Sequence, residues 1–175
     1  MEFTFRPGVP GDIDAVTALY EAAIDRLDAT TNYPGWQQGL YPTQRTAEDA
    51  LSEGCLYVAE QEGTLLGSMV LRHEPLEPYA EGRWLSALDY QDILVIYTFA
   101  VHPAAQGLGV GHAMLQSAAD FGVRSGIRSL RLDVYEQNLP AIHLYESCGF
   151  QCTGRVDLGL GDCGLPWFLL YEKLL

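Results

Sequence analysis

The sequence is poor in basic residues. Its 175 residues include 10 Lys and Arg against 23 Asp and Glu, which gives a formal net charge of −13 at pH 7. Because binding nucleic-acid phosphates requires clustered Lys and Arg, this charge argues strongly against a nucleic-acid partner. A negative field of this size favours the approach of cationic amines, and the same charge also serves solubility.

The sequence also lacks long apolar runs and metal-binding patterns. No run approaches the roughly 20 apolar residues that span a bilayer, and the first residues lack the basic start and apolar stretch of a signal peptide. The cysteines form no CxxC pair and have no His partner at zinc-ligand spacing, and the four histidines form no HxxxH pair. We therefore expect a cytoplasmic protein with reduced cysteines, no membrane association and no metal.

What is present is the composition of a globular protein, with 48% hydrophobic and 19% charged residues. The length fits one domain over residues 1–175. Apolar spacing predicts an α/β fold with a mixed sheet, in the order β-α-α-β-β-β-α-β-α-β-β. The run 93–101 is apolar at nearly every position, as in a strand covered on both faces. We expect a hairpin turn at Glu62-Gly63 and a second helix that starts with a capping box from Thr46 to Asp49.

A glycine-rich turn, Gln106-Gly107-Leu108-Gly109-Val110-Gly111, joins the strand 93–101 to the next helix. Glycines permit a tight turn with bare amide groups, and the positive end of the helix dipole adds attraction for phosphate oxygens. The turn lacks the Gly-Lys-Ser/Thr ending of a Walker A loop, and the third glycine of a dinucleotide fingerprint would fall at His112. The pattern therefore indicates a phosphate site of another kind.

The segment 101–111, Val–x–Pro–x–x–Gln–Gly–x–Gly–x–Gly between a strand and a helix, resembles the pyrophosphate-binding segment of the GNAT superfamily of acyl-CoA-dependent N-acyltransferases. The stretch 138–150, with its Asn, Ala, Leu-Tyr-Glu and Gly-Phe, is similar to that superfamily's other signature. Both motifs lie in the family's order and separation, and the resemblance extends over most of the chain.

The resemblance implies an N-acetyltransferase that moves the acetyl group of acetyl-CoA to a primary amine of a small molecule or peptide by direct attack. A homodimer is the assembly that we consider. An alternative from another class is a non-catalytic acyl-CoA-binding or sensing domain of the same fold. The absence of a carboxylate in the middle of strand 93–101 supports this alternative, and the presence of Tyr145 speaks against it.

The resemblance also implies roles for individual residues. The strand through Val101 would bulge or splay away from the strand through Leu132, and a backbone N–H of Phe99 or Val101 would support the oxyanion. Tyr145 matches the general acid that protonates the departing thiolate. The expected acetyl-CoA contacts are Phe99, Ala100, Val101, Gln106, Gly107, Leu108, Gly109, Val110, Gly111, Asn138, Ala141 and Tyr145.

The general base is unassigned. Several members of the family place Glu near the middle of the strand that reads Val95-Ile96-Tyr97-Thr98 here. Tyr97 is the nearest polar candidate, acting directly or through a water molecule. Glu74, Asp92 and Asp133 are further candidates, but we expect each of them at a solvated strand end.

The acceptor pocket is predicted from irregular, aromatic-rich segments. Trp36 and Tyr41 lie beside Gly and Pro residues, where bulky aromatics often line a concave site and can hold a cationic amine. An equal alternative for Trp36 is a core plug under the loop. Glu74, with Trp84 and Asp89, borders a second loop and would add charge recognition.

Overall fold

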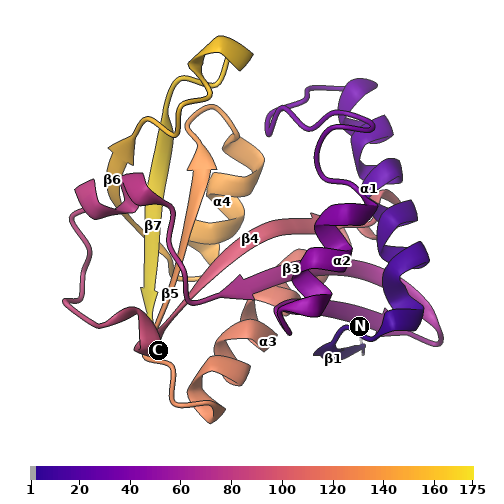
Figure 1. The fold of residues 1–175 in the computed structure, drawn as a ribbon, viewed down its shortest axis with the longest axis horizontal. Helices are drawn as coiled ribbons and strands as arrows, with labels where there is room; N and C mark the ends of the chain where they lie inside the picture. The colour runs from indigo at the N-terminus through magenta and orange to yellow at the C-terminus, as the bar shows by residue number, and fades with distance from the viewer. Residues whose placement is uncertain (1–2) are drawn as a thin grey trace. The chain divides into compact units, whose positions relative to one another are not determined.

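The computed structural model describes residues 3–175, which form a seven-stranded mixed sheet and four α-helices in the predicted order (Figure 1). Strands β4 and β5 pair in parallel, and the hydrogen-bonded order of the strands is β1-β2-β3-β4-β5-β7-β6. The elements are β1 Thr4–Pro7, α1 Ile13–Asp28, α2 Gln44–Ser52, β2 Leu56–Gln61, β3 Thr64–Arg72, β4 Ile93–Val101, α3 Val110–Arg124, β5 Ser129–Tyr135, α4 Leu139–Ser147, β6 Gln151–Val156 and β7 Phe168–Leu174.

The chain forms two compact units. The first unit comprises Met1–Asn32, described from residue 3 on, with Trp36–Leu71 and Tyr97–Ser117. The second comprises Tyr33–Gly35, Arg72–Ile96 and Ala118–Leu175. Strand β4 therefore begins in the second unit and ends in the first. Within residues 3–175, no helix is long and apolar enough to cross a bilayer.

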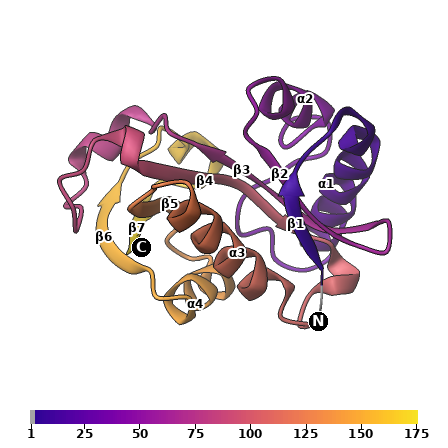
Figure 2. The ribbon, with the colours of Figure 1, turned by 90° about the horizontal axis from the view of Figure 1, so that it is seen from below.

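The core of the first unit lies between helices α1 and α2 and strands β2 to β4. Helix α1 buries one apolar face at helical spacing, as its sequence predicts, including Val16, Leu19 and Tyr20. Strands β1 and β2 run side by side in Figure 2 and pair antiparallel. In β3, an added Cβ at Gly67 would lie 2.8 Å from the carbonyl oxygen of Ala100. Glycine at this position therefore permits the close approach of β3 and β4.

Helix α2 begins earlier than the proposed capping box. Its N-cap is Thr43, which has an extended backbone, and the Thr43 N–H donates to Oγ1 of Thr46 at 3.0 Å. The prediction of a start at Thr46 was wrong because Thr43 is the N-cap. Thr46 lies in the first turn, and its side-chain oxygen accepts the hydrogen bond from the Thr43 N–H.

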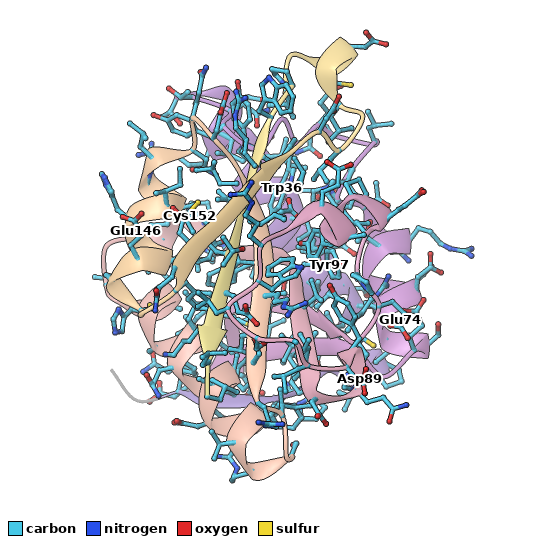
Figure 3. All side chains as sticks on the ribbon, turned by 90° about the vertical axis from the view of Figure 1, so that its left-hand side faces the viewer. Trp36, Glu74, Asp89, Tyr97, Glu146 and Cys152 are labelled. Carbon is cyan, nitrogen blue, oxygen red and sulfur yellow. The ribbon has the colours of Figure 1, made fainter. Side chains whose placement is uncertain are left out.

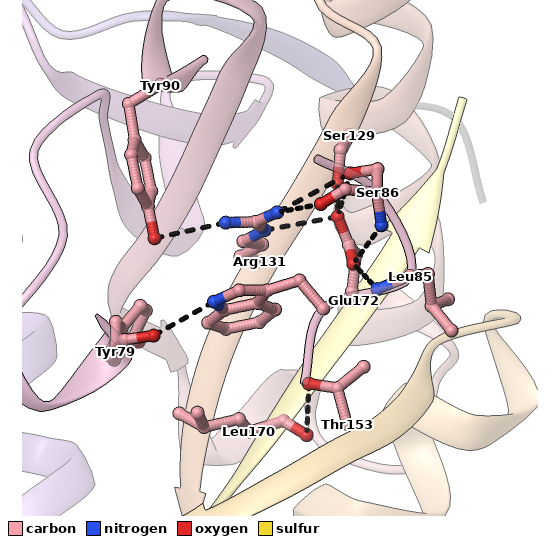
Figure 4. A network of polar contacts seen from close by, with 10 residues as sticks. Tyr79, Leu85, Ser86, Tyr90, Ser129, Arg131, Thr153, Leu170 and Glu172 are labelled. Carbon is pink, nitrogen blue, oxygen red and sulfur yellow. Dashed lines mark hydrogen bonds and ion pairs between the residues drawn. The ribbon is translucent and has the colours of Figure 1, made fainter. Parts of the chain in front are cut away.

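A buried ion pair lies at the centre of the second unit (Figure 4). The side chains of Arg131 in β5 and Glu172 in β7 are 2% and 0% exposed, and Nε of Arg131 lies 3.1 Å from Oε1 of Glu172. The other two guanidinium nitrogens donate to the Tyr90 hydroxyl at 3.1 Å and to the Ser86 carbonyl at 3.0 Å. The Trp84 ring stacks on the guanidinium at 4.0 Å. The pair therefore ties the irregular segment 84–90 to the sheet.

Glu172 is the acceptor at the centre of this network. The hydroxyls of Ser86 and Ser129 donate to it at 2.6 and 2.7 Å, and the Leu85 N–H also donates to it. Burial by itself raises the pKa of Glu172, but these hydrogen bonds and the charge of Arg131 outweigh burial, so that the pKa is lowered. Glu172 is therefore an ionised, fully hydrogen-bonded carboxylate within the protein.

Removing the cation from this pair should strongly destabilise the fold. We expect Arg131→Ala to lower the free energy of unfolding by about 3–5 kcal/mol, because Glu172 would remain buried and charged without its partner. Arg128→Ala is the control, since Arg128 is 66% exposed and lies 4.0 Å from Asp92, and it should cost at most about 0.5 kcal/mol. Urea denaturation measures the free energy of unfolding of both variants. Equal losses in the two variants would contradict this account.

Candidate active site

The glycine-rich turn exposes its backbone. Strand β4 leads through the short 3-10 helix Pro103–Ala105 into this turn, and α3 follows directly. Gly107 and Gly109 have φ of +75° and +81°, in the left-handed region that favours glycine. A Cβ added to either residue would meet no atom within 4 Å, and residues 106–109 are exposed. Bare amides thus stand at the N-terminus of a 15-residue helix, an arrangement that fits a phosphate group.

Strand β4 is distorted where the resemblance predicts a bulge. Thr98 has φ of +45°, which is rare for a β-branched residue. Its hydroxyl is 2.7 Å from the Tyr41 hydroxyl in the loop that precedes α2. The flanking side chains of Tyr97 and Phe99 are half-buried. The local departure from strand geometry therefore falls among the residues expected to face the acyl group. The hydrogen bond between the hydroxyls of Tyr41 and Thr98 stabilises it.

Trp36 packs partly buried against the core of the first unit, as does Tyr97, and both are labelled in Figure 3. Packing of this kind agrees with the interpretation of Trp36 as a core plug. The Trp36 ring also meets Tyr41 edge-on, with centroids 6.2 Å apart, and Tyr41 is 42% exposed. The first unit thus brings together Trp36, Tyr41 and the distorted part of β4.

Tyr145 is buried in the second unit, on α4. Its ring lies against Phe150 and Tyr171, with centroid distances of 5.9 and 6.4 Å. Burial raises the pKa of the Tyr145 hydroxyl well above its ordinary value, and the charge of Asp133 raises it further. The hydroxyl is therefore protonated at neutral pH.

Asn138 is the N-cap of α4. Its side-chain oxygen accepts a hydrogen bond from the Ala141 N–H at 3.3 Å. The family motif thus has a local structural use here, because the cap starts the helix that carries Tyr145. Both predicted contact residues, Asn138 and Ala141, are half-buried in the first turn of this helix.

Asp133 corrects one of the predictions. It lies inside β5 and is half-buried, rather than at a solvated strand end. The hydroxyl of Tyr79, a residue with no exposed surface, donates to Oδ2 of Asp133 at 2.7 Å. Burial raises the pKa of Asp133, and the Tyr79 hydrogen bond opposes that rise without cancelling it. Asp133 is therefore a carboxylate that binds protons more readily than an ordinary aspartate.

The other carboxylate candidates lie at the surface, as predicted. Glu74 is exposed in the segment after β3, and Figure 3 shows it and Asp89 near the outside of the second unit. Asp92 is half-buried and lies 4.0 Å from Arg128. Neither Glu74 nor Asp92 is placed in a buried polar environment like that of Asp133.

A cavity of about 390 Å³ lies wholly within the second unit. Its walls include Leu76, Glu77, Trp84 and Leu88, and the almost unexposed Tyr79 and Arg131 lie at its floor. The predicted acceptor residues Trp36, Tyr41 and Glu74 are not part of this lining. This cavity could have been predicted from the several aromatic residues in the connection between β3 and β4. The same kind of pattern led to the prediction of Trp36 and Tyr41.

Two curated relatives align with most of the chain. It is 29% identical over 155 residues to a mycothiol acetyltransferase from Acidothermus cellulolyticus, covering 86% of this chain and 44% of that protein. It is 28% identical to an L-methionine sulfoximine/L-methionine sulfone acetyltransferase from Salmonella typhimurium, covering 87% of this chain and 82% of that protein. The chain thus spans less than half the length of the mycothiol relative.

A crystal structure of a GNAT-family acetyltransferase from Streptococcus agalactiae 2603 matches with a TM-score of 0.81 and 25% identity, covering 99% of this chain and 95% of that one. The model of the acetyltransferase (GNAT) family matches residues 18–150, well over half of the chain. This match includes the strand β4, the glycine-rich turn and the helix that carries Tyr145. The chain therefore belongs to the GNAT family of acetyltransferases.

Proposed function

We propose that the protein is an N-acetyltransferase that transfers the acetyl group of acetyl-CoA to a primary amine of a small molecule or peptide. The observation that carries this proposal is the exposed glycine-rich turn at the N-terminus of α3, in a chain that the GNAT family model matches over residues 18–150. Tyr145 is a buried, neutral proton donor, and Asp133 is a carboxylate whose pKa is raised by burial. Transfer between a thioester and an amine needs one group of each kind.

The glycine-rich turn fits the diphosphate of CoA. Residues 106–109 are exposed, the glycines leave room for close approach, and the N-terminal end of α3 adds favourable charge. Phe99, Ala100 and Val101 of β4 are the proposed contacts for the pantetheine arm in the first unit. In the second unit these contacts are Asn138, Ala141 and Tyr145. The family match extends over parts of both units, which supports one catalytic domain over residues 1–175.

Acetyl-CoA supplies a thioester whose carbonyl carbon is the electrophile. Asp133 accepts a proton from the attacking amine as the carbon–nitrogen bond forms. A backbone N–H of Phe99 or Val101, beside the left-handed Thr98, donates to the oxygen that gains charge. Tyr145 donates its proton to the sulfur as the carbon–sulfur bond breaks. The products are the N-acetylated acceptor and CoA as its thiol.

Tyr97 remains the alternative base, since it lies in β4 next to the distorted residue Thr98. Asp133 is favoured because burial raises the pKa of its carboxyl group, which makes it a stronger proton acceptor than an ordinary aspartate. A buried proton donor and a half-buried carboxylate with a raised pKa also favour catalysis over a sensing domain, which needs neither. Trp36, Tyr41 and Glu74 remain acceptor candidates.

Gly109→Val should weaken CoA binding by about 10-fold to 100-fold, because a side chain at φ of +81° displaces amides that donate to charged phosphate oxygens. Gly63→Val is a matched control. Gly63 also has φ of +81° and no atom within 4 Å of an added Cβ, but it lies in the β2–β3 turn. Calorimetry with CoA measures both affinities. An unchanged affinity in Gly109→Val would refute the phosphate-loop assignment.

Tyr145→Phe should lower kcat by about 10²–10⁴-fold while CoA affinity changes little, since the ring stays and only the proton donor is lost. Tyr171→Phe is the control. The Tyr171 hydroxyl donates to Glu146 at 2.9 Å and belongs to the same aromatic packing. Its loss should change kcat by no more than a few-fold. A steady-state assay of thiol release measures kcat for the wild type and both variants. A folded Tyr145→Phe variant with wild-type kcat would show that Tyr145 is not the general acid.

The pKa of Asp133 should rise further in Tyr79→Phe, because that variant loses a hydrogen bond that favours the ionised carboxylate. Titration of the side-chain carboxyl carbons by NMR measures this pKa, and Asp133→Asn identifies the signal by its disappearance. Tyr135→Phe is the control, since Tyr135 also lies in β5 but its hydroxyl donates to the Gly164 carbonyl. An Asp133 signal that titrates at an ordinary aspartate pKa in the wild type would argue against its role as base.

A further inference from the structure

The cavity in the second unit has the walls of a site for an apolar group. Leu76, Trp84 and Leu88 contribute aliphatic and aromatic surface, together with Ala80 and Ala87. Its volume of about 390 Å³ falls within the range of small-molecule sites, which is about 300–1,000 Å³. Leu76 is 42% exposed at this surface. An apolar ligand group would therefore find both room and apolar surface here.

The charges around the cavity disfavour an anion. Arg131 is the cation at the floor, but Glu172 balances its charge, and Nε, Nη1 and Nη2 all donate to protein acceptors. The lining also includes the carboxylate of Glu77, which has an exposed side chain. The floor thus offers no uncompensated positive charge, and the rim offers a negative one. A ligand with an ammonium group fits this arrangement better than one with a carboxylate.

The cavity also adjoins the proposed base. Tyr79 lies at its floor and donates its hydroxyl to Asp133 at 2.7 Å. The backbone carbonyl of Tyr79 accepts from the indole of Trp84 in the cavity wall at 2.9 Å. One buried side chain therefore separates the apolar cavity from the carboxylate proposed to deprotonate the acceptor.

We propose that this cavity holds the non-reacting body of the acceptor, and that the acceptor class is a primary amine on an aromatic or branched aliphatic group without a carboxylate. This inference rests on the proposed function and adds the chemical class of its substrate. The apolar body packs against Leu76, Trp84 and Leu88. Glu77, whose exposed side chain belongs to the cavity lining, attracts the ammonium form of the acceptor and repels anionic competitors.

Binding of three probes to the full chain tests the assignment by calorimetry. 2-Phenylethylamine has the proposed chemistry, 3-phenylpropionate replaces its amine with a carboxylate, and methylamine lacks the apolar body. We expect 2-phenylethylamine to bind at least about tenfold more tightly than either of the others. Equal or tighter binding of 3-phenylpropionate would overturn the charge assignment, and no binding of 2-phenylethylamine would overturn the proposal.

Two leucine variants locate the binding site. Leu76→Ala should weaken 2-phenylethylamine binding about tenfold, because it removes wall surface from the apolar group. Leu85→Ala is the matched control, since Leu85 is 43% exposed in the same segment but does not line the cavity, and it should leave the affinity within twofold. Equal affinities in wild type and Leu76→Ala would place the ligand elsewhere.

Acetylation of 2-phenylethylamine in the presence of acetyl-CoA separates this proposal from the one on which it rests. Binding that depends on Leu76 without any acetylation would support the cavity and count against the proposed function. Acetylation with a kcat/KM that is unchanged in Leu76→Ala would support the function and overturn the cavity. Acetylation that falls about tenfold in Leu76→Ala, but not in Leu85→Ala, supports both.

Discussion

The buried guanidinium of Arg131 imposes the constraint on which the second unit depends. A charge with 2% of its side-chain surface exposed needs an opposite charge and partners for its donors. Glu172 supplies the charge, and Ser86 and Tyr90 supply acceptors from the connection between β3 and β4. Because these partners come from segment 84–90, that segment must close against β5 and β7. The cavity and its floor follow from this closure.

The burial of Arg131 also affects the position of Asp133, the proposed catalytic carboxylate. Trp84 stacks on Arg131 and donates its indole N–H to the Tyr79 carbonyl, and Tyr79 in turn donates to Asp133. The position of a proton acceptor in β5 is thus linked to an ion pair that takes no part in the chemistry. Arg131 and Asp133 are two residues apart in one strand and therefore share a face of the sheet.

Much of the fold could be predicted because its signals are local. The apolar run at Ile93–Val101 matches β4 residue for residue, and the turn at Glu62-Gly63 joins β2 to β3 as predicted. The start of α2 was misplaced because two threonines three residues apart compete for the cap, and the pattern of side chains alone does not rank them. Residue spacing is informative about periodic elements and much less so about their first residue.

In the candidate site, too, some residues could be predicted from the sequence and others could not. The glycine-rich turn and the helix of Tyr145 are contiguous motifs, so their residues could be named from the sequence. The environment of Asp133 could not, because its partner Tyr79 lies 54 residues earlier, in the short 3-10 helix Glu77–Glu81. The cavity has the same origin, since its walls come from a stretch without apolar periodicity. Long-range pairing of irregular segments leaves little trace in residue spacing.

The backbone conformation at position 109, and not the space for a side chain, limits which residue can stand there. Its φ of +81° is disfavoured for L-residues, yet a Cβ placed there would touch nothing within 4 Å. A mirror-image residue such as D-alanine prefers this region of φ and would meet no neighbour. In a semisynthetic protein, D-alanine would therefore keep the turn in place and restrict its motion in the unfolded chain. The turn is thus a position where chirality, and not size, decides which residue the backbone accepts.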